Sequence, residues 1–423
     1  MNPSENDQQQ VCQPCLTKQA LKVRISFFFD GTLNNMENVR AGTPDKGGSY
    51  ANDLTNVVRL YDALLPESDS FAHHLTIYTE GVGTEDRKED HRKIGGGLGM
   101  GPTGVKNKAE AGWNSGLKIM KAEGIDISAQ LDITIDVFGF SRGAACARYF
   151  IYKFLNDHDN FRNQPAVEFG YHTIMQCRCR YIGLFDTVAS YGLMHKNDTA
   201  DLNLKAIQLA ETGLHLCAAE EHRENFRLTD TRSNSSVLEL FLPGVHSDIG
   251  GGYPPQDSEE QWEVYIPGGF WSLFSSRKTR KKAIRRQKKW LTDRRWYEDT
   301  ELTVDGDYKK LIAKRQKIYN NYTYIPMHMM ADHSKQKGGL KYDLMALEKH
   351  AIPEDLTDLK KTLETCLNQG THYDWMNDTS TEMQKVRHKY FHFSARYNGI
   401  GHNPQWSDKG SIDGKRQRII QEG

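Results

Sequence analysis

LDITIDVFGFSRGAACARY, residues 131–149, is the stretch of sequence that decides the fold of this chain. Its first half alternates the apolar residues Ile133, Ile135 and Val137 with polar ones, which predicts a strand. Its second half is rich in alanine, which predicts a helix. A strand that runs directly into a helix is the repeating unit of α/β proteins, so the stretch indicates that class.

The junction between this strand and this helix reads Gly139-Phe140-Ser141-Arg142-Gly143, a G-x-S-x-G motif. A sharp strand-to-helix turn strains its middle residue, and glycine on either side avoids collisions with the neighbouring strand and helix. The serine oxygen is then exposed at the carboxyl edge of the sheet, in front of the positive end of the helix. We predict that Ser141 is a nucleophile; the alternative is a tight turn without a chemical role.

The composition excludes several classes of protein. The chain has 423 residues and a formal net charge of zero, so no overall field favours nucleic acid or acidic lipid. Its mean hydropathy is −0.68, and no apolar run approaches the roughly 20 residues that span a bilayer. Residues 1–20 are polar, so we expect a mobile N-terminal arm, no signal peptide and a protein made in the cytoplasm.

No cofactor and no metal are expected from the motifs. The seven cysteines are an odd number, and Cys12 and Cys15 lack a second pair at zinc-binding spacing. Residues 95–104 contain a formal G-x-G-x-x-G, but a charged run precedes them where a dinucleotide site needs an apolar strand. FDGTL at residues 29–33 resembles a phosphatase motif, but Phe28 stands where that chemistry needs its aspartate nucleophile.

Further segments predict strands and helices along the rest of the chain. We expect strands at 21–29, 75–78, 178–185, 237–242 and 390–397, and helices at 52–65, 105–123, 201–221, 308–319 and 354–368. This alternation predicts a mostly parallel sheet with helices on both faces. Residues 21–423 are interpreted as one domain, with a lid-like basic and aromatic insertion at about 255–300.

Three reactive side chains each follow a predicted strand: Ser141, Asp186 and His246. The carboxyl ends of parallel strands meet at one edge of a sheet, so these side chains are expected to lie close together. A histidine can take the serine proton, and an aspartate fixes the tautomer of that histidine and stabilises its cation. Because the order serine, aspartate, histidine is that of α/β-hydrolases, the sequence predicts this fold with a catalytic triad.

The oxyanion of such a reaction needs two N–H donors. We expect the amide of Arg142, the residue after the nucleophile, and the amide of Gly31 or Thr32, in the turn after the first strand. Several alternatives stay open: Asp186 as a helix N-cap, His246 as a structural residue of a glycine-rich turn, Asp248 as a competing acid or beside a divalent ion, and His402 as a reserve base. For Asp248, bracing of its own turn is the preferred interpretation.

The insertion is strongly basic. Residues 277–295 carry eleven Lys or Arg and one acidic residue. Basic side chains are attracted to anionic membranes, and tryptophan prefers the membrane interface. We expect docking on a bilayer through Trp271, Phe274, Lys281, Lys282, Arg285, Arg286 and Trp290. The alternative is a solvated helix, and nucleic-acid binding is not expected because no recognition module accompanies the basic run.

Several motifs together resemble a known family. FFFDGTLNN, GVGT, GFSRGAA, GLFDTVAS, CAAEEHRENF and PGVHSDIGGGY, spread over about residues 23–400, are similar to a bacterial α/β-hydrolase domain family. That family includes the phospholipase effectors of type VI secretion, of the G-x-S-x-G lipase class. The resemblance implies that the family's serine, aspartate and histidine fall on Ser141, Asp186 and His246.

The resemblance also implies a function. It implies a serine-dependent phospholipase of A1 or A2 type, which acts as an antibacterial toxin and needs no cofactor. The implied partners are a phospholipid membrane as substrate, a cognate immunity protein, and a spike or tube component of the type VI machinery that delivers the effector to the periplasm of the target cell. Two alternatives stay open, a soluble carboxylesterase on small acyl esters and a non-enzymatic module that binds a membrane or a partner.

Overall fold

A six-stranded parallel sheet organises the computed structural model, which describes residues 20–67, 70–91, 101–172, 174–189, 201–267, 275–399, 401–407 and 415–423. The strand order is β3-β1-β4-β5-β6-β8. The strands are β1 (Leu21–Phe29), β3 (His73–Thr79), β4 (Leu131–Phe140), β5 (Ile174–Phe185), β6 (Ala210–Ala218) and β8 (Val237–Leu242). The predicted α/β class with a mostly parallel sheet is therefore confirmed.

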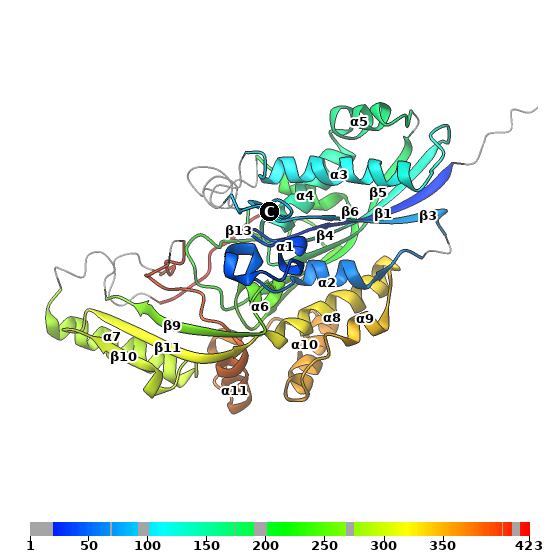
Figure 1. The fold of residues 1–423 in the computed structure, drawn as a ribbon. Coiled ribbons are helices and arrows are strands. Elements are labelled where there is room, and N and C mark those ends of the chain that lie inside the picture. Colours follow the sequence, from blue (N-terminus) through cyan, green and yellow to red (C-terminus); the bar gives the residue numbers. More distant parts are fainter. Residues whose placement is uncertain are drawn as a thin grey trace, which may run out of the picture.

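Helices cover both faces of this sheet (Figure 1). On one face α3 (Val105–Ala122) and α4 (Arg142–Leu155) enclose a buried cluster with Phe27, Trp113 and Phe150. The other face is covered by α2 (Asn56–Ala63), α6 (His246–Gly250) and α8 (Tyr324–His333). Because both faces are covered, the central strands are buried along most of their length, and the buried Arg24 on β1 pairs with the buried Asp136 on β4.

Shorter elements complete this part of the molecule. The strand β2 pairs with β12, and β13 pairs with β7. Their bounds, and those of the remaining helices, are α1 (Met36–Arg40), β2 (Leu64–Leu65), α5 (Gln164–Glu168), β7 (Leu228–Thr229), β12 (Lys341–Tyr342), α9 (Leu344–Glu348), α10 (Thr357–Gln369), α11 (Thr381–Tyr390) and β13 (Ile420–Gln421).

The insertion forms a second, antiparallel sheet with one long helix. Its strands are ordered β10-β11-β9, namely β10 (Leu302–Asp305), β11 (Lys310–Tyr319) and β9 (Gln256–Tyr265), and α7 (Arg277–Asp293) lies with them at one end of the molecule (Figure 1). The predicted helix at 308–319 is wrong. Leu311, Ala313 and Arg315 are buried and the residues between them are not, which is the two-residue period of a strand.

Two other predictions need correction. The helix expected at 201–221 is instead a short 3₁₀ turn followed by β6, because a strand buried on both faces shows no alternation and resembles a buried helix. The helix expected at 52–65 begins only after Thr55, whose hydroxyl accepts a hydrogen bond from the Val58 N–H at 3.4 Å. The strand-like segment 390–397 is the end of α11 followed by extended chain outside any ladder.

Candidate active site

Ser141 is the single residue that connects a strand to a helix, since β4 ends at Phe140 and α4 begins at Arg142. Its backbone has φ 58° and ψ −125°, a strained conformation for a residue with a side chain. The flanking glycines make this turn possible. A Cβ on Gly143 would lie 2.2 Å from the Asp30 carbonyl oxygen, and a Cβ on Gly139 would lie 2.5 Å from the Gly143 carbonyl oxygen. The geometry is that of a nucleophile elbow.

Asp186 follows β5 directly and has a positive φ of 46°. Its Oδ2 lies 2.5 Å from His246 Nδ1, and its Oδ1 accepts the Ala218 N–H at 2.8 Å. The Arg418 guanidinium donates to both oxygens, at 2.6 Å and 2.8 Å. Among the described residues, no N–H of a following helix donates to this carboxylate, which does not favour the N-cap alternative.

His246 opens the short helix α6, and its ring is buried between two aromatic rings. The ring centroids of Phe140 and Phe226 lie 4.6 Å and 4.9 Å from that of His246. Because a carboxylate only accepts hydrogen bonds, Asp186 assigns the proton to Nδ1 and leaves the lone pair on Nε2. This is the tautomer that a general base for a serine hydroxyl requires.

Backbone contacts bring the three residues to one edge of the sheet. The Ser141 N–H donates to the Phe185 carbonyl oxygen at 3.0 Å, so the serine lies beside the residue that precedes Asp186. The Val188 N–H donates to the Ser141 carbonyl oxygen at 3.3 Å. The Asp186–His246 hydrogen bond then joins β5 to the turn after β8.

The protonation states suit this arrangement. Burial raises the pKa of Asp186, but the nearby Arg418 charge and the His246 hydrogen bond outweigh burial and hold this pKa well below its ordinary value. Burial also lowers the pKa of His246, against the opposing effect of Asp186. An ionised aspartate therefore faces a histidine that is neutral near pH 7.

The turn after β1 lies against the elbow. Arg142 Nε donates to the Thr32 hydroxyl at 2.7 Å, which joins the two predicted oxyanion turns. The Gly31 N–H donates to the Asp30 carboxylate at 2.7 Å, whereas the Thr32 N–H has no partner within the described part of the chain. Asp30 itself is buried and also accepts the hydroxyls of Thr55 and Tyr78, at 2.7 Å each.

Asp248 and His402 each have hydrogen-bond partners other than Asp186. Asp248 accepts the Val245 N–H at 2.9 Å and bonds His392 Nδ1 at 2.8 Å, so it braces its own turn. His402 Nδ1 bonds the Ser394 carbonyl oxygen at 3.1 Å. Neither contact favours a role as competing acid or reserve base.

Sequence reasoning missed several residues that support this site. Glu221 accepts the His246 N–H at 3.3 Å and is paired with Arg223, while Phe226 packs on the His246 ring. All three belong to CAAEEHRENF, a motif that the sequence analysis used only as part of the resemblance to a family, without assigning a role to its residues. Arg418 belongs to no motif, and no pattern in the sequence pointed to it.

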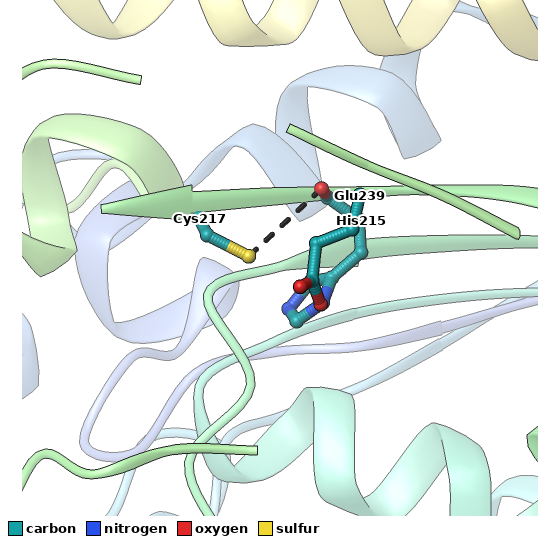
Figure 2. Close-up of side chains that lie close together, drawn as sticks. All are labelled: His215, Cys217 and Glu239. Atoms are coloured by element: carbon teal, nitrogen blue, oxygen red, sulfur yellow. Dashed lines mark hydrogen bonds and ion pairs between the residues drawn. The ribbon is translucent and has the colours of Figure 1, made fainter. Parts of the chain in front are cut away.

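One group of side chains has the composition of a metal site (Figure 2). Potential ligand atoms of His215, Cys217 and Glu239 lie within 4.8 Å of one another. The His215 nitrogens are both engaged, since Nε2 accepts the Thr187 N–H at 3.1 Å and Nδ1 lies 3.0 Å from the Glu239 carboxylate. Burial raises the pKa of the Cys217 thiol well above its ordinary value. These residues fit a hydrogen-bonded brace for the turn after Asp186 better than a metal site.

The predicted docking residues are only partly within the described chain. Trp271 and Phe274 lie outside the described residues, as do residues 95–100, Cys12 and Cys15. On α7, Lys282, Arg285 and Arg286 are exposed, and Lys281 lies 5.4 Å from the centroid of the Tyr308 ring. Trp290 is half-buried against the core beside His222, so it does not point outward from the helix. Within the described ranges, none of the helices combines the length and the apolar character that a membrane span requires.

A parallel sheet with a serine elbow, an aspartate and a histidine after the ends of β4, β5 and β8 defines an α/β-hydrolase-like protein. The chain belongs to the Tle1-like phospholipase effectors of the type VI secretion system. Its residues 24–159 and 156–266 match the family described as "T6SS, Phospholipase effector Tle1-like, catalytic domain". The protein is therefore a type VI phospholipase effector, and hence a hydrolase.

One solved structure supports the fold. The chain is similar to the Tle1 effector whose structure was solved bound to the VgrG spike, with a TM-score of 0.67 and 19% identity over 96% of this chain and 94% of that chain. An uncharacterized protein from Pseudomonas aeruginosa aligns with a TM-score of 0.43 and 17% identity over 86% of this chain and 52% of its own. The comparison with curated proteins gave no match.

Proposed function

We propose that this effector hydrolyses acyl esters of membrane phospholipids with Ser141 as the nucleophile, as a phospholipase of A1 or A2 type. The observation that carries the proposal is the 2.5 Å contact between Asp186 and His246 beside the Ser141 elbow. The family supplies the substrate class, and the site supplies the chemistry.

The reaction follows from the roles of these groups. His246 Nε2 takes the proton of the Ser141 hydroxyl as its oxygen attacks the ester carbonyl, and Asp186 stabilises the imidazolium that forms. The amides of Arg142 and Thr32 are the proposed donors to the tetrahedral oxyanion. The imidazolium then gives its proton to the departing lysophospholipid alcohol. Water, activated by His246, hydrolyses the acyl-serine and releases the fatty acid.

The direct test is fatty-acid release from liposomes with positionally labelled acyl chains. Ser141→Ala should lower turnover by around a millionfold, and the label released by the wild-type protein assigns A1 or A2. Ser115→Ala, a half-buried serine on α3, serves as the matched control and should keep full activity. An active Ser141→Ala protein would refute the proposed nucleophile.

The same samples separate the two alternative functions. A soluble carboxylesterase would cleave short-chain esters through Ser141 but would not accelerate at a lipid interface. A non-enzymatic module would not react with a fluorophosphonate probe, whereas the proposed enzyme should be labelled at Ser141 and not after Ser141→Ala.

We also propose that the outer face of α7 docks on anionic membranes. Lys278, Lys282 and Arg285 are exposed at helical spacing on the side opposite the buried Ile284 and Leu291. In the described part of the chain no ion pair involves these three residues. Each basic residue near an anionic surface contributes about 1 kcal/mol, so the three together support a preference for such lipid.

Neutralising Lys278, Lys282 and Arg285 to glutamine tests this docking face. The variant should bind phosphatidylglycerol vesicles about 100-fold more weakly, from about 3 kcal/mol of lost attraction. Neutralising the exposed Lys335, Lys337 and Lys349 provides a matched control. Unchanged vesicle binding by the α7 variant would leave this helix as a solvated face.

The remaining proposals concern delivery. A spike component of the VgrG kind is the proposed carrier, because the Tle1 effector of similar fold was solved bound to the VgrG spike. We also propose a cognate immunity protein in the producing cell and action in the periplasm of the target cell. A separate proposal concerns the architecture: residues 21–423 form a single catalytic domain. Co-purification with a VgrG spike tests the carrier. Survival of a sensitive strain that expresses a candidate immunity protein tests the second partner.

A further inference from the structure

The segment 415–423 brings a charged side chain from the end of the sequence to the candidate active site. It lies along β7: the Leu228 N–H donates to the Ile419 carbonyl oxygen and the Asp230 N–H to the Gln421 carbonyl oxygen, at 3.0 Å each. The marked C-terminus lies close to the sheet in Figure 1. This pairing points the side chain of Arg418 toward the end of β5.

Every nitrogen of the Arg418 guanidinium has a partner. Nη1 and Nη2 donate to the two Asp186 oxygens at 2.6 Å and 2.8 Å. Nη1 also donates to the Ala218 carbonyl oxygen at 2.8 Å, and Nε donates to that of Phe226 at 3.1 Å. The Arg418 side chain is only 5% exposed. Two parallel bonds between planar groups fix the plane of the carboxylate as well as its position.

The Asp186 carboxylate is shared between Arg418 and His246. Its Oδ2 accepts from both of them, and its Oδ1 accepts from Arg418 and from the Ala218 N–H. A carboxylate whose negative charge already faces a guanidinium stabilises a neighbouring imidazolium less. Arg418 therefore both holds Asp186 toward His246 and limits how strongly the pair binds a proton.

We propose that Arg418 is a positioning residue, which fixes Asp186 toward His246 and keeps the histidine deprotonated at mildly acidic pH. The inference rests on the proposed function, because it assigns Asp186 and His246 to the reaction. Other charged or titratable groups also face the pair and stay unchanged in the experiment: Glu221, Arg223 and Cys217.

The test compares pH profiles of kcat/KM for a short-chain phosphatidylcholine kept monomeric, whose headgroup does not titrate between about pH 5 and 9. Arg418→Met should move the acidic limb upward by about one to two pH units and lower kcat on the order of 10- to 100-fold, with KM unchanged. Arg418→Lys keeps the charge but loses the two parallel hydrogen bonds to Asp186. The acidic limb of its pH profile should therefore stay near that of the wild type, while kcat falls.

A buried arginine elsewhere provides the control. Arg148 donates to the carbonyl oxygens of Leu204 and Asp230 and does not contact Asp186, so Arg148→Met should lower stability without moving the limb. The inference would be overturned if the acidic limb of the Arg418→Met pH profile lay at the same pH as that of the wild type. It would also be overturned if Arg418→Lys had the wild-type kcat. If Arg418→Met does not fold, the lysine variant alone decides. Ser141→Ala in the same assay separates the two proposals, since residual activity there refutes the nucleophile and not the role of Arg418.

Discussion

The backbone N–H of Ser141 donates a hydrogen bond to the carbonyl oxygen of Phe185 at 3.0 Å, across the boundary between β4 and β5. The register of the sheet places Phe140 opposite Phe185, so the residues after them, Ser141 and Asp186, leave the sheet side by side. The relative position of serine and aspartate is thus fixed by backbone pairing and not by their side chains.

The elbow should not tolerate a methyl group at Gly143. A Cβ there would lie 2.2 Å from the Asp30 carbonyl oxygen and 2.4 Å from that of Phe29, and both are backbone atoms that cannot move aside. We expect Gly143→Ala to lower the free energy of unfolding by about 3 kcal/mol and to abolish fatty-acid release.

Urea unfolding measures this effect, with Gly116→Ala as the matched control. A Cβ on Gly116 would meet ring carbons of Phe27 at 3.5 Å and of Trp113 at 3.6 Å, which are ordinary contact distances. Alanine in this helix interior should therefore stabilise the protein by up to about 1 kcal/mol. Wild-type stability of Gly143→Ala would contradict the close approach of the turn after β1 to the elbow.

Glu221 and Arg223 should prove to be coupled. Glu221 is buried and accepts from Arg223, Ser394 and the His246 N–H, so Glu221→Gln leaves the Arg223 charge without its partner. Removing one member of a buried pair costs about 3–5 kcal/mol. The enzyme should lose activity as well, because Glu221 also bonds the turn that carries His246.

A double-mutant cycle with Arg223→Met tests the coupling by urea unfolding. The double variant should recover part of the stability that Glu221→Gln loses, because no unpaired charge remains. Simple addition of the two losses would show that the residues act independently.

Asp30 should make the stability of the protein depend on pH. Burial raises the pKa of Asp30 to about 6. The folded protein therefore holds this proton more tightly than the unfolded chain, and the contribution of Asp30 to stability falls as the pH rises from about 4 to about 6.

An asparagine side chain resembles the protonated acid, so Asp30→Asn should remove this decline, which reaches at most about 1.4 kcal/mol per pH unit. Urea unfolding at a series of pH values measures it, and Glu110→Gln, an exposed acid on α3, is the control. Parallel stability curves for Asp30→Asn and the wild type would contradict the raised pKa.

The group of His215, Cys217 and Glu239 should not bind zinc. Both nitrogens of His215 already take part in hydrogen bonds, and a metal would have to displace the Thr187 N–H or the Glu239 carboxylate. We expect zinc to leave the Tm unchanged. A rise in Tm that Cys217→Ser abolishes would show that the group is a metal site after all.

The sequence predicted well those elements that show a local pattern. The strands at 21–29 and 237–242 match β1 and β8, and the helix at 105–123 matches α3 to within one residue. The candidate serine, aspartate and histidine were also found from local signals, because each follows a strand in a turn rich in glycine or polar residues. The prediction failed at β6, where burial on both faces removes any alternation, and at β11, where a buried arginine obscured it.

By itself, then, the sequence determined the fold class, the family and the order of the candidate catalytic residues. Only the tertiary structure decided which groups surround Asp186. Arg418 lies 232 positions away in sequence from Asp186, in a segment without a motif, and reaches it because the strand β13 pairs with β7. A hydrogen bond between distant segments depends on how the whole chain packs, and such a contact leaves no trace in the periodicity of either segment.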